Sequence, residues 1–125
     1  KQSTISQSWS NDRGKTWTPM KESNLPNPNA GTDAVTLSNG TQLIVYNHTK
    51  RSGRFPSGRN MLNIAISNDG KDWEPVMTLE KSKGEYSYPA VIQTNDSKIH
   101  ITYTYRRISI KHVVIDPSKL GKKGK

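Results

Sequence analysis

The chain has 125 residues, a length that suits one domain of ordinary size. Hydrophobic residues make up 30% of it and the mean hydropathy is −0.84, so the composition supplies only a thin core. No stretch approaches the roughly 20 apolar residues of a transmembrane helix, so no membrane is predicted as a partner. The chain contains no cysteine, which excludes disulfides, thiolate catalysis and cysteine-based zinc sites.

The formal net charge of +9, with a pI near 9.9, raises the question of nucleic-acid binding. Part of the excess lies in the segment "KLGKKGK", residues 119–125, which we expect to be a flexible basic tail. The remaining basic residues are spread over turns and strand ends without interleaved aromatic residues. The pattern therefore does not favour nucleic acid, and an anionic small substrate explains some of these arginines equally well.

The apolar residues gather in short runs rich in Val, Ile, Tyr and Thr, with period-two alternation and no helical period. This pattern predicts an all-β protein. In chain order we expect a strand end with a polar turn, a link rich in Pro and Asn, four strands, and three more strands. These segments cover residues 5–20, 24–31, 33–80 and 86–116. Asn39-Gly40 is a strong hairpin signal between the first two of the four strands.

One polar turn motif occurs twice in the sequence, as "SNDRGKTW" from Ser10 and as "SNDGKDW" from Ser67. In each copy the Asp can accept bonds from backbone N–H groups, a Gly supplies a positive φ, the Ser ties the turn, and the Trp packs beneath the hairpin. A calcium loop is the alternative, but one or two carboxylates cannot supply its roughly 6–8 oxygen ligands. We therefore predict a structural role, and no metal, for Ser10, Asp12, Gly14, Trp17, Ser67, Asp69, Gly70 and Trp73.

The two serines are 57 residues apart, and about four strands fill each period. A repeat near 50 residues with four strands indicates blades of a β-propeller. We expect a partial propeller over residues 1–118: a blade end at 5–20, a full four-stranded antiparallel blade at 33–80, and a partial blade at 86–116. Such a piece has open sheet edges, so the predicted partners are the remaining blades or further copies of the chain.

The motif Ser-x-Asp-x-Gly-x-x-Trp resembles the Asp box, the bacterial neuraminidase repeat of sialidase-like six-bladed propellers. The segments "LPNPNAGTDAVTLSNGTQLIVYNHT", "RNMLNIAISNDGKDW" and "GEYSYPAVIQTNDSKIHITYTYRRISIKHVVIDP" are similar to the C-terminal third of these proteins. The resemblance implies a glycoside hydrolase for terminal sialic acid or a related acidic sugar, without a cofactor. Three arginines would clamp the sugar carboxylate, a Tyr paired with a Glu would be the nucleophile, and an Asp the acid/base.

Carried over residue by residue, Arg59 matches the third clamp arginine and Tyr86 matches the nucleophile, with Tyr88 a rival two residues later. From the residues alone, a solvated strand start is the favoured interpretation of Arg59, and ordinary aromatic packing is the favoured interpretation of Tyr86. The functional roles of both residues depend on the resemblance. Asn47 and His48 end a strand before the loop "TKRSGRFPSGR" and are candidate pocket-wall residues.

Arg106 and Arg107 are candidates to contact an anionic sugar or face solvent, and we assign Arg107 to substrate binding. The sequence departs from the sialidase pattern at Thr104, which stands where the resemblance implies a Glu that orients an arginine. The other two clamp arginines, the acid/base Asp and the Glu partner of the nucleophile would belong to earlier blades. A non-catalytic glycan-binding or scaffold propeller module therefore remains the alternative. His100 and His112 lie on strand patterns and are interpreted as packed or surface residues rather than ligands.

Overall fold

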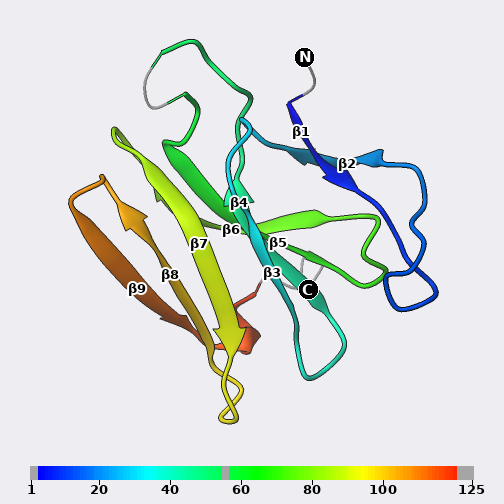
Figure 1. Ribbon diagram of the computed structural model, residues 1–125. Helices are drawn as coiled ribbons and strands as arrows, with labels where there is room; N and C mark the ends of the chain where they lie inside the picture. The colour runs from blue at the N-terminus through cyan, green and yellow to red at the C-terminus, as the bar shows by residue number, and fades with distance from the viewer. Residues whose placement is uncertain (1–2, 55–56, 121–125) are drawn as a thin grey trace.

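The computed structural model describes residues 3–54 and 57–120, and in this part of the chain it contains nine strands, one short 3-10 helix and no α-helix (Figure 1). The strands form three antiparallel sheets, so the prediction of an all-β protein is confirmed. The elements are β1 (Thr4–Gln7), β2 (Lys21–Pro26), β3 (Asp33–Thr36), β4 (Gln42–Asn47), β5 (Met61–Ser67), β6 (Glu74–Lys81), β7 (Tyr86–Gln93), β8 (Ile99–Tyr105), β9 (Ser109–Ile115) and η1 (Pro117–Lys119).

The central sheet has the order β3-β4-β5-β6, in which each strand pairs with its neighbour in sequence. This up-and-down arrangement of four strands is that of a propeller blade. Its first turn lies at Asn39-Gly40, where Gly40 adopts φ +87° and its N–H donates to Leu37 O at 2.8 Å. The first sheet holds only β1 and β2, and β2 extends to Pro26, into the segment expected to be a link.

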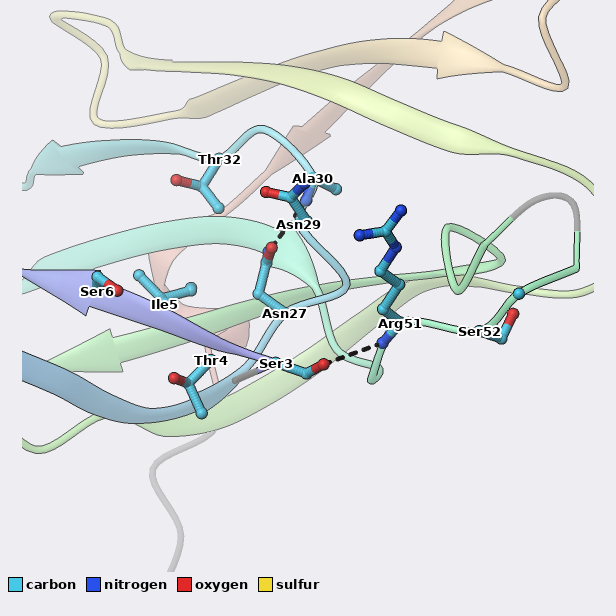
Figure 2. A pocket seen from close by; sticks show the side chains of 11 residues that line it. Ser3, Thr4, Ile5, Ser6, Asn27, Asn29, Ala30, Thr32, Arg51 and Ser52 are labelled. Atoms are coloured by element: carbon cyan, nitrogen blue, oxygen red, sulfur yellow. Dashed lines mark hydrogen bonds between the residues drawn. The ribbon is translucent and has the colours of Figure 1, made fainter. Parts of the chain in front are cut away.

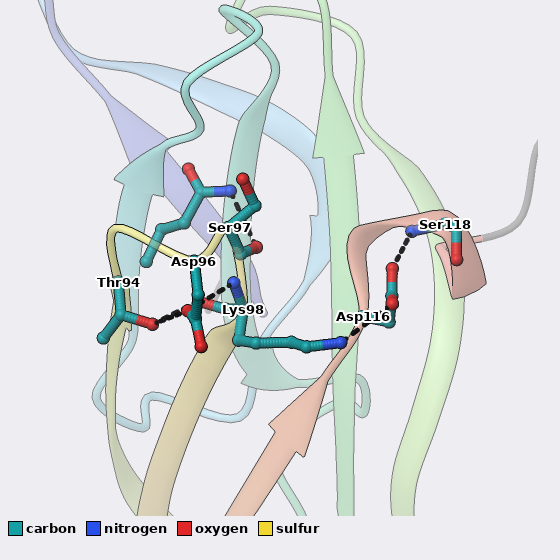
Figure 3. A network of polar contacts seen from close by, with 7 residues as sticks. Thr94, Asp96, Ser97, Lys98, Asp116 and Ser118 are labelled. Carbon is teal, nitrogen blue, oxygen red and sulfur yellow. Dashed lines mark hydrogen bonds and ion pairs between the residues drawn. The ribbon is translucent and has the colours of Figure 1, made fainter.

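The third sheet has the order β7-β8-β9 and ends in η1. Figure 3 shows how the turn between β7 and β8 is tied to the start of η1: Lys98 Nζ lies 2.9 Å from Asp116 Oδ2, and Asp116 Oδ1 accepts from Ser118 N as the cap of η1. Of the predicted basic tail, Lys119 belongs to η1 and Leu120 is buried in the core. Residues 121–125 of that tail lie outside the described residues.

The central sheet is covered on both faces, because alternate side chains along β4 and β5 point in opposite directions. One face packs against the third sheet, through Leu43, Val45, Leu62 and Ile64 against Val91, Ile99, Ile101 and Tyr103. The other face packs against the first sheet, through Ile44, Tyr46 and Ala65 against Ile5 and Leu25. Three sheets thus stack face to face, as successive blades do.

The two repeated turns share one hydrogen-bond scheme, although the donors to the two aspartates differ. Ser10 Oγ and Ser67 Oγ accept from Gly14 N and Gly70 N, both at 2.8 Å, while Asp12 and Asp69 accept from backbone N–H groups further along their turns. Donation to a carboxylate favours its charged form, and it lowers the pKa of both aspartates.

The two turn tryptophans differ. Trp73 is half-buried beside the packing of the first and central sheets, whereas Trp17 is 63% exposed and donates from Nε1 to Gly14 O. The expectation that Trp17 packs beneath its hairpin was wrong. The physical reason is its position: Trp17 precedes β2, which begins only at Lys21, so it lies beyond the sheet that would cover it.

Among the described residues, the structure contains no helix with the length and apolar character needed to cross a membrane.

Candidate functional site

Three loops meet at one end of the central and third sheets: residues 48–54 and 57–60 between β4 and β5, 82–85 between β6 and β7, and 106–108 between β8 and β9. Backbone hydrogen bonds fasten them together, from Tyr86 N to Arg59 O and from Arg106 N to Glu85 O, both at 2.8 Å. These bonds bring Arg59, Glu85 and Arg107 into one place, although they come from three separate segments. The loops lie at the upper ends of β4, β7 and β8 in Figure 1.

A small open pocket of about 280 Å³ lies between these loops and the link after β2. Its wall combines the guanidinium groups of three arginines with one carboxylate. The lining residues are Pro28, Asn29, Arg51, Ser57, Arg59, Glu85 and Arg107. We call it the arginine pocket. Three cations against one anion leave it with a net positive charge, which suits an anionic ligand.

Glu85 is buried in the wall of the arginine pocket, and a buried carboxylate requires partners. Its Oε2 accepts from Ser87 Oγ at 2.9 Å. The arginines are further away: Arg59 Nη1 lies 4.0 Å from Oε1, and Arg107 Nε lies 3.7 Å from Oε2. Both distances exceed hydrogen-bond range, so Glu85 attracts the two guanidinium groups to the pocket without engaging them in a close bidentate pair.

Tyr88 lies beside the arginine pocket because β7 contains a bulge. The register with β8 shifts between Ser87 and Ala90, and Tyr88 adopts φ +53°. On a regular strand, Tyr86 and Tyr88 would point to the same face of the sheet. The bulge turns the Tyr88 side chain in a different direction. The ring of Tyr88 is 65% exposed, and Arg59 Cζ lies 5.7 Å from its centroid. The exposed phenol therefore stands next to the clamp candidate.

Tyr86, the predicted nucleophile, lies elsewhere. It is fully buried, and its hydroxyl contacts Ser82 Oγ at 2.6 Å, donates to Lys83 O at 3.0 Å, and accepts from Arg106 Nε at 3.1 Å. The bond with Ser82, followed by the contact with Arg106, lowers the pKa of the Tyr86 phenol. The backbone of Tyr86 is thus hydrogen-bonded to Arg59, whereas the Tyr86 hydroxyl contacts Ser82, Lys83 and Arg106 instead of the arginine pocket.

Asn47 and His48, the candidate wall residues, lie behind the loop and do not line the arginine pocket. Asn47 is fully buried, and its Nδ2 donates to Met61 O at 3.0 Å and to Tyr86 O at 2.8 Å, which ties β4 to β5 and β7. The His48 ring hydrogen-bonds the Tyr46 hydroxyl, and burial lowers the pKa of this histidine. Both residues support the loop that carries Arg51 and Arg59.

A second, larger cavity of about 1010 Å³ adjoins the arginine pocket and shares Asn29 and Arg51 with it (Figure 2). Its lining is mostly polar and comes from β1, the link after β2, and the loop after β4. Figure 2 shows the Arg51 side chain extending beside Asn29 and Ala30, while Arg51 N donates to Ser3 Oγ at 3.4 Å. Arg51 therefore stands between the two cavities.

Sequence reasoning missed Glu85, Arg51 and the pairing of two histidines. Glu85 is the one acidic residue in the polar turn of residues 82–85 before β7, and this feature could have identified it from the sequence. His100 and His112 are partners across β8 and β9, with Nδ1 and Nε2 3.0 Å apart, which no sequence spacing reveals. Among the described residues, no group of three or more side chains that could hold a metal ion was found.

Comparison with known proteins assigns the chain to a family. The family model described as "BNR repeat-like domain" matches residues 1–101. These residues include both Asp boxes, the loop between β4 and β5, and β7. No curated protein and no solved structure matched the chain. The match covers most of the 125 residues and confirms the resemblance to the Asp-box, sialidase-like repeat proteins. The chain belongs to the BNR repeat-like domain family.

Proposed function

We propose that the chain is part of a sialidase-like propeller that binds a terminal acidic sugar, sialic acid or a related one, in the arginine pocket. The observation that carries the proposal is the convergence of Arg51, Arg59 and Arg107 on one small pocket around the buried Glu85. A guanidinium group can donate two parallel bonds to a carboxylate. Because arginine has five N–H donors, Arg59 can bind Asn29 O, as it does at 3.4 Å, and still hold a ligand.

Hydrolysis of the bound sugar is the enzymatic form of this proposal. A tyrosine oxygen would attack the anomeric carbon, the bond to the leaving sugar would break, a general acid would protonate the leaving oxygen, and water would release the product. Tyr86 stays the nucleophile predicted from sequence, but its hydroxyl is buried among Ser82, Lys83 and Arg106. The exposed Tyr88, 5.7 Å from Arg59 Cζ, is the better-placed rival.

A non-catalytic glycan-binding or scaffold module is the second candidate. The burial of Tyr86 favours it, because a nucleophile must reach the anomeric carbon and a fully buried hydroxyl with three partners cannot do so without rearrangement. The two candidates share the arginine pocket and differ only in turnover.

Titration calorimetry of the intact chain with N-acetylneuraminic acid, and with neutral galactose as a control ligand, tests the proposal. Arg59→Gln should weaken binding of the acid by about tenfold or more, as expected for loss of a charge-assisted pair. Arg13→Gln removes the same charge from an exposed turn outside the pocket and should leave binding unchanged. Equal binding of galactose, or no loss in Arg59→Gln, would rule out the proposed pocket. Turnover of a fluorogenic sialoside then separates the enzyme from the binding module.

A further inference from the structure

The loop end of the sheets is strongly basic, and the opposite end is not. The three loops at residues 48–60, 82–85 and 106–108 carry one acidic residue, Glu85, against the basic residues Lys50, Arg51, Arg54, Arg59, Lys83, Arg106 and Arg107. The turns at the other end, residues 68–73 and 94–98, mix Asp69, Asp72 and Asp96 with Lys71 and Lys98. The positive charge of the chain is therefore concentrated where the arginine pocket lies, and it attracts anions there.

A second pocket of about 340 Å³ lies at this same end. It is lined by Thr49, Lys50, Ser52, Arg54, Gly58, Asn60, Lys83 and Gly84. Its three charged groups are Lys50, Arg54 and Lys83, and its lining contains no carboxylate. In the part of the chain that the structure describes, no ion pair is formed by these three side chains. We call it the lysine pocket.

The lysine pocket and the arginine pocket share the same two chain segments. Gly58 and Asn60 line the lysine pocket, whereas Arg59 between them lines the arginine pocket. In the same way, Lys83 and Gly84 line one pocket and Glu85 lines the other. The two pockets are therefore neighbours, separated by the width of the segments that carry Arg59 and Glu85.

The two pockets differ in the cations that line them, and each pocket suits one anionic group of a single ligand. Arginines form planar forks that match a carboxylate, whereas lysine ammonium groups are compact charges that accept an anion of any shape. A monosaccharide with one carboxylate matches the arginine pocket and cannot fill both pockets at once. The charge in the lysine pocket needs a second anionic group, on a sugar linked to the first.

We propose that the lysine pocket is a second anion subsite and that the ligand is an acidic oligosaccharide with anionic groups on successive sugars. This inference rests on the proposed function, because the first sugar is held by Arg59. Single-stranded RNA is less well matched, since sequence-tolerant RNA sites stack successive bases on several aromatic side chains, and among the described residues of this site the exposed aromatic ring is that of Tyr88.

The test compares monomers with linked dimers by titration calorimetry of the intact chain. The probes are N-acetylneuraminic acid and its glycosidic dimer, and galacturonic acid and its dimer. For at least one pair, the dimer should bind about tenfold more tightly than the monomer, as expected for one added charge-assisted contact. The triple variant Lys50→Gln/Arg54→Gln/Lys83→Gln should abolish this advantage and leave monomer affinity unchanged. Circular dichroism checks that the variant is folded.

A charge-matched control is available in Lys15→Gln/Lys21→Gln/Lys71→Gln, which removes three exposed lysines away from the pocket. If this control weakens the dimer as much, or if neither dimer binds wild-type protein better than its monomer, the second subsite is disproved while Arg59 binding stands. If Arg59→Gln leaves monomer binding intact, the proposed function itself fails. If a uridine oligonucleotide binds more tightly than either dimer, the glycan proposal is wrong and the ligand of the site is RNA.

Discussion

The guanidinium group of Arg59 lies over the ring of Tyr88, with Cζ 5.7 Å from the ring centroid. The two residues come from different parts of the fold, since Arg59 lies in the loop before β5 of the central sheet and Tyr88 belongs to β7 of the third sheet. Tyr88 reaches this place by adopting φ +53°, a conformation that costs a residue with a Cβ atom roughly 1–2 kcal/mol. Its ring gains little from burial, because it is 65% exposed. Strain without compensating burial favours a functional role for Tyr88.

Replacing Tyr88 with Gly should therefore separate stability from binding. Glycine tolerates the positive φ, so the free energy of unfolding should stay the same or rise by up to about 1 kcal/mol in urea denaturation. Acidic-sugar binding should weaken about threefold or more, because the cation–π contact that orients Arg59 is worth about 0.5–1 kcal/mol. Tyr88→Phe keeps that ring and should bind like wild type. A clear loss of stability in Tyr88→Gly would contradict the assignment of strain.

Tyr86 should behave in the opposite way. Tyr86→Phe keeps the buried ring but removes the hydroxyl that contacts Ser82, Lys83 O and Arg106, so it should cost about 1–2 kcal/mol of stability. Binding of the acidic sugar should be unchanged. If the protein hydrolyses a sialoside and Tyr86→Phe abolishes turnover while Tyr88→Phe does not, the nucleophile is Tyr86, as predicted from sequence.

The different positions of Tyr86 and Tyr88 show which structural features can be predicted from the sequence. Strand alternation and the spacing of Ser10 and Ser67 predicted sheets of about four strands, because both depend on local periodicity. The bulge that separates Tyr88 from Tyr86 depends on how β7 pairs with β8, a long-range register that no local pattern contains. The same holds for Glu85, whose contacts with Arg59 and Arg107 join three loops.

The Asp boxes should make the fold sensitive to acid. Backbone and side-chain hydrogen bonds, led by those from Thr16, lower the pKa of Asp12 from its ordinary 3.8 to about 2, and the pKa of Asp69 is also lowered. In the window between these values the unfolded chain binds more protons than the folded chain, so stability falls as the pH drops from about 4 toward 2.

Thermal unfolding followed across this pH range checks the effect. Asp12→Asn/Asp69→Asn should be less stable than wild type at neutral pH and should lose less stability on acidification, because the titrating groups are gone. Asp72→Asn removes a carboxylate from the second turn and keeps Asp69, so it should retain the wild-type pH dependence. An unchanged acid slope in the double variant would show that other groups control acid unfolding.

The outer face of the third sheet should be covered by another sheet. Ile92, Ile110 and Val114 are exposed there, at 57%, 77% and 51%, and they share one face by register. The central sheet is covered on both faces, and continuing that stack places a further blade on this one. We propose that the isolated chain satisfies this face by self-association. Light scattering should then give a mass above that of one chain, and Ile110→Asp/Val114→Asp should reduce it to one chain. A monomeric wild type would contradict this prediction.

Gly58 should control both pockets through the loop of residues 48–60. It adopts φ +88°, and a Cβ at this position would meet Lys50 O and Thr49 Oγ1 at 2.7 Å and Pro28 Cβ at 2.8 Å. Gly58→Ala should therefore cost about 2 kcal/mol or more, through backbone strain and through overlap with the main-chain oxygen of Lys50 and the side chains of Thr49 and Pro28. Since the loop carries Arg51 and Arg59, binding of the acidic monosaccharide should fall in parallel.

Gly53→Ala is the matched control for Gly58→Ala, because it makes the same change in the same loop. A Cβ at Gly53 would meet no heavy atom within 4 Å, so Gly53→Ala should change neither the urea midpoint nor the affinity. Urea denaturation and calorimetry on both variants provide the comparison. If Gly58→Ala unfolds and binds like Gly53→Ala, the tight packing of this loop does not set the geometry of the arginine pocket, and the placement of Arg59 must be determined by its contacts with Glu85 and Tyr88 instead.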